Sequence, residues 1–164
     1  MALTYEPIAT YTLPSNAVNY TFTSIPGTYT DLICRMSVKN VSTGSIDFLL
    51  NVDTSQAYSR LVYYSGTSTV GSIDYSGQYQ GRLTGNADPL STAFCQYEFS
   101  INSYANASYQ KNIQYKSWAR NQGTDIGVNN WTGTAAITSI RILNSAGNNF
   151  AAGSTFTLYG ITKA

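Results

Sequence analysis

The stretch Asp31-Leu32-Ile33-Cys34-Arg35-Met36-Ser37-Val38-Lys39-Asn40-Val41 carries the clearest β-strand signal in this sequence. Its even-numbered residues from Leu32 to Val38 are apolar, whereas its odd-numbered residues from Arg35 to Lys39 are charged or polar. Successive side chains of an extended strand point to opposite faces, so this pattern predicts a strand with one buried face. The pair Thr43-Gly44 that follows is typical of a turn.

The same two-residue period recurs along the chain, and amphipathic helical spacing is hard to find. Turn signals such as Pro14 and Pro26-Gly27 separate the segments, because proline presets φ and glycine accepts positive φ. Residues 77–90, which contain Asp88-Pro89 and several glycines, are predicted to form a long loop. The other predicted strands are 8–13, 19–25, 46–52, 60–64, 70–75, 94–101, 112–119, 137–143 and 155–161.

About nine or ten strands with regularly spaced turns predict an all-β fold, an antiparallel β-sandwich that is jelly-roll-like. A chain of 164 residues is long enough for one domain with its own core, and we assign residues 14–164 to it. Residues 1–13 form either the first strand of that domain or an N-terminal arm that reaches a neighbouring subunit. The sequence leaves both alternatives open.

The composition favours a binding or structural role over catalysis, with fourteen tyrosines, no histidine and 10% charged residues. Histidine titrates near neutral pH and serves in most acid–base, triad and zinc sites. The formal net charge is +1 and the basic residues are scattered, so we expect no nucleic-acid partner. No stretch approaches the ~20 apolar residues of a membrane span, and the start shows no secretion signal. We therefore expect no membrane partner and synthesis in a cytoplasm.

Few residues could support catalysis or metal binding. Residues 51–55 offer oxygen atoms but lack the spaced carboxylates of a calcium loop, so we interpret them as a polar turn. Asp47 with Asp53, or Asp74 with Glu98, could act as a glycosidase pair only if the fold placed them within a few ångströms. Nothing in the sequence does so, and the serines lack a histidine base. We predict no enzymatic activity, no catalytic residue, no cofactor and no metal.

Cys34 and Cys95 both fall on the apolar side of a predicted strand. We interpret them as buried thiols that act as small hydrophobic residues, and a disulfide between them is the alternative that the sequence leaves open.

The aromatic residues are too many for one small core. Tyrosine and tryptophan combine flat apolar area with a hydrogen-bonding tip, which suits protein interfaces and sugar stacking alike. The candidate interface residues are Tyr5, Ile8, Tyr63, Tyr64, Tyr75 and Tyr79. The candidate sugar-stacking residues, under the alternative of a carbohydrate-binding protein, are Tyr104, Tyr109, Asn129 and Trp131.

The segment from Tyr20 to Leu32 contains the pattern F-x-S-I-P-x-T-Y-T-x-L. It resembles the opening of the small virion structural proteins of tailed bacteriophages. Leu50 to Thr54, with Tyr58-Ser59, resembles their N-G-D-T-G-x-x-Y-S turn, although Val52 stands where the family usually has glycine. Trp131, residues 134–140, residues 149–151 and residues 154–161 resemble their ending. The blocks keep the family order from about residue 20 to residue 161, and the last block is the most specific.

The resemblance implies a β-sandwich virion protein without enzymatic activity, made in a bacterial host. Tail fibres usually attach through an anchor or shaft, whereas this chain begins almost directly with the sandwich. We therefore expect a capsid decoration or cement protein on the outer surface of the virion. Its expected partners are the major capsid protein and copies of itself, as a trimer or dimer. The alternative is a receptor-binding tail-fibre or tail-tip protein that binds a glycan.

Overall fold

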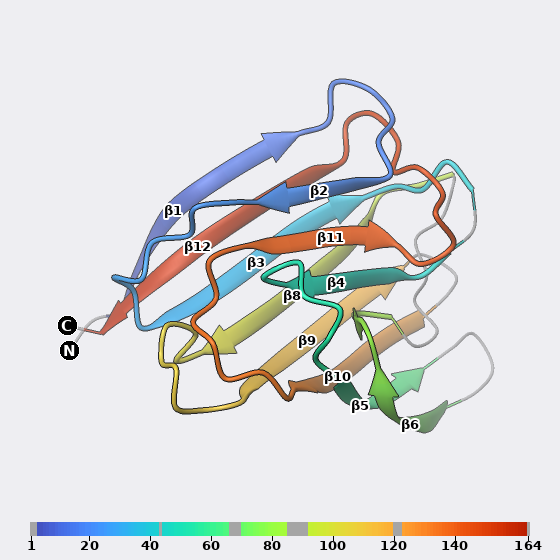
Figure 1. Ribbon diagram of the computed structural model, residues 1–164. Helices are drawn as coiled ribbons and strands as arrows, with labels where there is room; N and C mark the ends of the chain where they lie inside the picture. The colour runs from blue at the N-terminus through green and yellow to red at the C-terminus, as the bar shows by residue number, and fades with distance from the viewer. Residues whose placement is uncertain (1–2, 43, 66–69, 85–91, 120–122, 164) are drawn as a thin grey trace.

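The computed structural model describes residues 3–42, 44–65, 70–84, 92–119 and 123–163, and all regular secondary structure within them is β-strand (Figure 1). Two antiparallel sheets pack against each other. The larger sheet has the order β1 (Leu3–Thr12), β12 (Thr155–Lys163), β3 (Asp31–Val38), β8 (Cys95–Asn102), β9 (Lys111–Ala119), β10 (Gly123–Trp131), β5 (Tyr58–Ser65) and β6 (Val70–Gln78). The smaller sheet has the order β2 (Asn19–Phe22), β11 (Ile140–Asn144), β4 (Ile46–Leu50) and β7 (Gly81–Arg82). The predicted antiparallel β-sandwich is confirmed, and its jelly-roll topology stays a prediction.

The hydrophobic core lies between the two sheets and draws side chains from both. Phe48 of β4 stacks on Phe99 of β8, with ring centroids 5.6 Å apart, and meets Tyr58 of β5 edge-on at 5.5 Å. Cys34 and Cys95 are buried in this core and unpaired, which confirms their interpretation as free thiols. The apolar positions of β3 are buried as its alternation predicted.

Two strands were missed by the sequence prediction. β10 was missed because its inward positions include Asp125, Gly127 and Asn129, so an apolar period is not visible. β7 falls inside the loop predicted for residues 77–90, where Gly81 and Arg82 pair with Phe48 and Asp47 of β4. Residues 85–90 of that predicted loop lie outside the described residues.

The first described segment, β1, forms an edge of the larger sheet. It pairs with β12 of the same chain from Leu3 opposite Lys163 to Thr12 opposite Thr155, with a bulge between Pro7 and Ala9. Proline lacks the amide that a central strand would need, and it is tolerated at edges and bulges. Within this chain, residues 3–12 are therefore the first strand of the domain, which is one of the two alternatives left by the sequence.

The turn after β4 uses an unusual backbone conformation. Asn51 and Val52 both have φ of 53°, and the Asp53 amide donates to the Leu50 carbonyl at 3.0 Å. Glycine tolerates this left-handed region and valine does not, so valine at this position introduces local strain. The Asp53 carboxylate accepts from the Ser55 amide and hydroxyl, and these hydrogen bonds lower its pKa. The segment is thus a polar turn, as its sequence suggested.

Candidate functional site

The outer face of the larger sheet, directed away from the smaller sheet, carries an exposed apolar cluster. Its members are adjacent across β9, β10 and β5: Ile126 lies opposite Tyr63, and Thr124, two residues before Ile126, lies opposite Trp118. The side chains of Tyr63, Trp118 and Ile126 are 62%, 50% and 61% exposed. Large apolar side chains that gather on one open face often mark an interaction site. We call Leu61, Tyr63, Trp118 and Ile126 the outer-face patch.

Beside this patch, two cations of the outer face pair with one shared carboxylate. Glu98 of β8 lies opposite Arg35 on one side and Lys116 on the other, and its oxygens lie 2.7 and 3.0 Å from their nitrogens. Burial alone would raise the pKa of Glu98, but hydrogen bonds and charge from Lys116 and Arg35 hold it below its usual range. The outer face therefore combines the outer-face patch with an adjacent cluster of two cations and one anion.

The candidate interface residues do not form one surface. Tyr63 belongs to the outer-face patch, whereas Tyr64 points to the opposite side of β5 and packs over Gly71. Tyr5 and Ile8 lie on β1, at the other end of the strand order, with Tyr5 exposed and Ile8 half-buried against the core. Tyr75 lies in β6, and its side chain is outside the described part of the molecule. Tyr79 is exposed in the connection between β6 and β7.

The sugar-stacking prediction is wrong for three of its four residues. Trp131, Tyr104 and Asn129 are 1%, 0% and 0% exposed, so no ring face or amide is available to a ligand. Trp131 packs over Gly133, and the Tyr104 hydroxyl donates to the Pro26 carbonyl, which ties two loops together. Tyr109 is exposed in the β8–β9 connection and stays a candidate.

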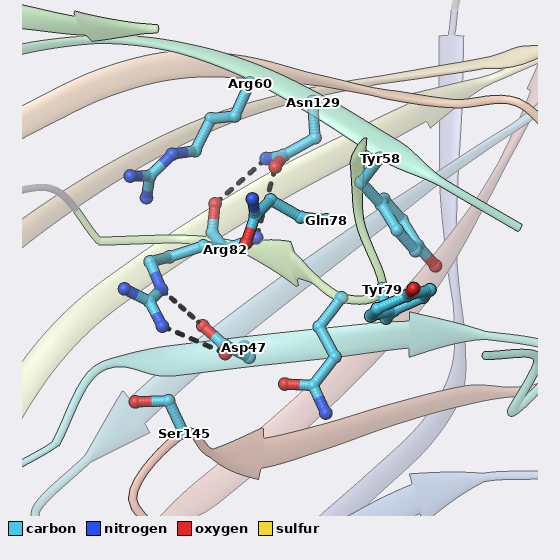
Figure 2. A pocket seen from close by; sticks show the side chains of 9 residues that line it. Asp47, Tyr58, Arg60, Gln78, Tyr79, Arg82, Asn129 and Ser145 are labelled. Carbon is cyan, nitrogen blue, oxygen red and sulfur yellow. Dashed lines mark hydrogen bonds and ion pairs between the residues drawn. The ribbon is translucent and has the colours of Figure 1, made fainter. Parts of the chain in front are cut away.

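A polar pocket opens between the sheets where β7 meets β4, β10 and the end of β6, with a volume of about 380 Å³ (Figure 2). At its centre, Asp47 accepts from Arg82 Nε at 2.8 Å and from Nη2 at 3.3 Å. The Asp47 side chain is 4% exposed, whereas that of Arg82 is 40% exposed. The ion pair therefore has a buried carboxylate and a guanidinium that reaches solvent.

Asn129 holds the backbone of the same arginine. Its Oδ1 accepts from the Arg82 amide at 3.1 Å, and its Nδ2 donates to the Arg82 carbonyl at 2.9 Å. Arg60, which lies opposite Asn129 on β5, donates to the Thr84 carbonyl at 2.5 Å. The two-residue strand β7 is thus held by Asp47 through the Arg82 side chain and by Asn129 through the Arg82 backbone.

Lys111 is another buried cation, and all of its hydrogen bonds are structural. Its Nζ donates to the carbonyls of Asn106, Tyr109 and Thr134, which joins the β8–β9 connection to the segment after β10. Burial lowers the pKa of Lys111. All three partners are backbone oxygens, so Lys111 serves to hold loops together.

Sequence reasoning counted Trp118 among the surplus aromatic residues without assigning it to a site, and it missed Ile126 and the Asp47–Arg82 pair. Trp118 gives a usable signal, because it ends an outward series whose other members, from Asn112 to Lys116, are polar. Ile126 gave no usable signal, because the strand that contains it, β10, was not predicted. Asp47 was considered only with Asp53, and its actual partner lies in a segment predicted to be loop.

No protein-family model matches this chain, and no curated protein sequence is significantly similar to it. Among the described residues, no group of three or more acidic, cysteine or histidine side chains could hold a metal ion. No helix within the described ranges is long and apolar enough to cross a membrane. Candidate functions therefore depend on the outer-face patch, the polar pocket and the motifs quoted from the sequence.

Proposed function

We propose that this protein is a structural component of a tailed-bacteriophage virion that decorates the capsid and stabilises the shell through protein–protein contacts. The outer-face patch is the observation that carries the proposal. A flat sheet face with exposed tryptophan, tyrosine and isoleucine matches the composition of interface cores, in which aromatic residues are enriched. The phage-like motifs support the same function.

The charge arrangement supports a protein partner over a nucleic-acid partner. Glu98 pairs with both Arg35 and Lys116, so these two cations on the outer face are already engaged by a carboxylate. Burying such an arrangement against a capsid protein leaves one positive charge, which an acidic residue of the partner could compensate. In this proposal many symmetric copies each bury a modest area, and the shell gains stability from their sum.

Immunogold electron microscopy of purified virions, with antibody raised against this chain, tests the location. Label distributed over the head is the expected result. Label confined to the tail tip would overturn decoration in favour of receptor binding. Virions without label, when the same antibody detects the purified protein, would overturn a virion location altogether.

Co-sedimentation with shells that lack this protein tests the surface. Ile126→Lys places a charge in the centre of the outer-face patch and should reduce shell binding by about tenfold or more, since charge is depleted at interface cores. Val18→Lys changes another exposed β-branched apolar residue, which lies outside the larger sheet, and serves as the matched control. Equal binding by both variants, with both folded, would show that the patch is not the contact surface.

A further inference from the structure

The polar pocket of Figure 2 has a built interior that the proposed decoration function does not use. Arg82 is anchored twice, through its side chain by the buried Asp47 and through its backbone by the buried Asn129. Two buried polar residues thus hold Arg82, and its guanidinium has a fixed orientation at the surface of a pocket. A binding group that is already ordered loses little conformational entropy when a ligand arrives.

The walls of the pocket add an aromatic surface and further polar groups. Tyr79 lines the pocket and is 70% exposed, which leaves most of its ring uncovered. Figure 2 shows Gln78 and Ser145 on opposite sides of the ion pair, with Tyr79 to one side. Gln78 offers amide donors and an acceptor, and Ser145 offers a hydroxyl, so both can bond a ligand that has donors and acceptors.

The Asp47 carboxylate at the base of the pocket disfavours an anionic ligand at Arg82, and the buried Arg60, which also lines the pocket, donates to the Thr84 carbonyl. Asp47 already occupies the side of Arg82 that would otherwise bind a carboxylate or phosphate in a two-point contact. The carboxylate would also repel an anion brought against it. The pocket therefore suits a small molecule with one apolar face and several hydroxyl groups, and its volume of about 380 Å³ lies at the lower end for small-molecule sites.

We propose that this pocket binds one neutral pyranose unit of a glycan. The C–H face of the sugar packs on the Tyr79 ring, and adjacent hydroxyl groups bond Arg82, Gln78 and Ser145. Sugar binding here uses none of the outer-face patch residues. The inference is therefore independent of the proposed decoration function, and the two can fail separately.

Titration of the ¹⁵N-labelled full chain tests the site, with the methyl glycosides of glucose, galactose, mannose and N-acetylglucosamine as probes. At least one glycoside should shift the Arg82 Nε–H and the Tyr79 amide signals in a saturable manner. Inorganic phosphate should not compete. Saturable shifts that map only to other residues, or no shifts with all four glycosides, would overturn the proposal, and displacement by phosphate would replace it with an anion site.

Two variants at exposed positions complete the test. Tyr79→Ala should weaken binding of the responding glycoside by about tenfold or more, because the stacking surface is lost. Tyr11→Ala removes an exposed tyrosine of β1 that does not line the pocket, and its affinity should match that of the unmodified protein. Unchanged affinity in Tyr79→Ala would refute stacking on this ring.

Discussion

Two regions of the inner face of the larger sheet are similarly buried but chemically different, and we call them the apolar end and the polar end. Around β3 and β8 the inward residues are apolar, with Cys34, Met36 and Phe99 almost inaccessible to solvent. Around β10 and β5 the inward residues include Asp125 and Arg60, which are nearly as inaccessible. Apolar burial stabilises without fixing direction, whereas buried polar groups must meet specific partners. The polar end can therefore position groups for binding in a way that the apolar end cannot.

Phe99→Ala disrupts packing in the apolar end and is expected to have the largest effect on the free energy of unfolding. The ring is buried and stacked on Phe48, so its removal should lower the free energy of unfolding by about 3–5 kcal/mol. Urea unfolding followed by circular dichroism measures the change, with the exposed Tyr109→Ala as the control. A loss below about 1 kcal/mol would mean that this end is not close-packed.

Asn129→Ala breaks the polar end, and the adjacent Asn130→Ala is its matched control. Asn129 is buried with two hydrogen bonds to the Arg82 backbone, so its loss should cost about 1–3 kcal/mol. Asn130 points to the outer face and bonds the exposed Asn112 amide, so its loss should stay within about 0.5 kcal/mol. The same urea experiment compares them. Equal effects would indicate that the Asn129 contacts add nothing to the attachment of β7.

Glu98→Gln should have a smaller effect than Phe99→Ala or Asn129→Ala, and it compares the outer face with the inner face. The carboxyl group is partly exposed, so its loss should cost no more than about 1 kcal/mol at pH 7. The pKa of Glu98 is lowered in the folded state, so its stabilisation is present above the unfolded pKa of about 4.3. It is lost as the pH falls through the lower folded pKa. Unfolding free energies of both proteins at pH 7 and near pH 3 should therefore converge at the lower pH, and a constant difference would contradict the assignment.

The sequence predicted the apolar end well because alternation is visible without any knowledge of partners. The even-numbered residues of β3 and the odd-numbered residues of β8 point inward as their pattern indicated. The polar end could not be predicted in this way, because Asp125 and Asn129 are buried only where partners from other strands satisfy them. A period-based prediction reads such residues as solvated.

The candidate site shows the same limit. Tyr63 and Tyr79 were predicted as binding residues from composition, and both are exposed, but they lie on different surfaces. Trp131 and Tyr104 have the same chemistry and are buried instead. Residue type alone could not separate these pairs, because exposure depends on the sheet face for Tyr63 and Trp131 and on the fold of the connections for Tyr79 and Tyr104.

Chemical labelling of the two unpaired thiols can report the transient opening of the folded protein. Cys34 and Cys95 are sealed in the core, and burial raises the pKa of Cys34, so a thiol reagent should react only when the sandwich transiently separates. The labelling rate then measures the frequency of opening without denaturant or heat. Because the readout is chemical and confined to this chain, the same measurement works inside a larger assembly. Slower labelling there than in the isolated protein would give the stabilisation that each copy gains from its neighbours.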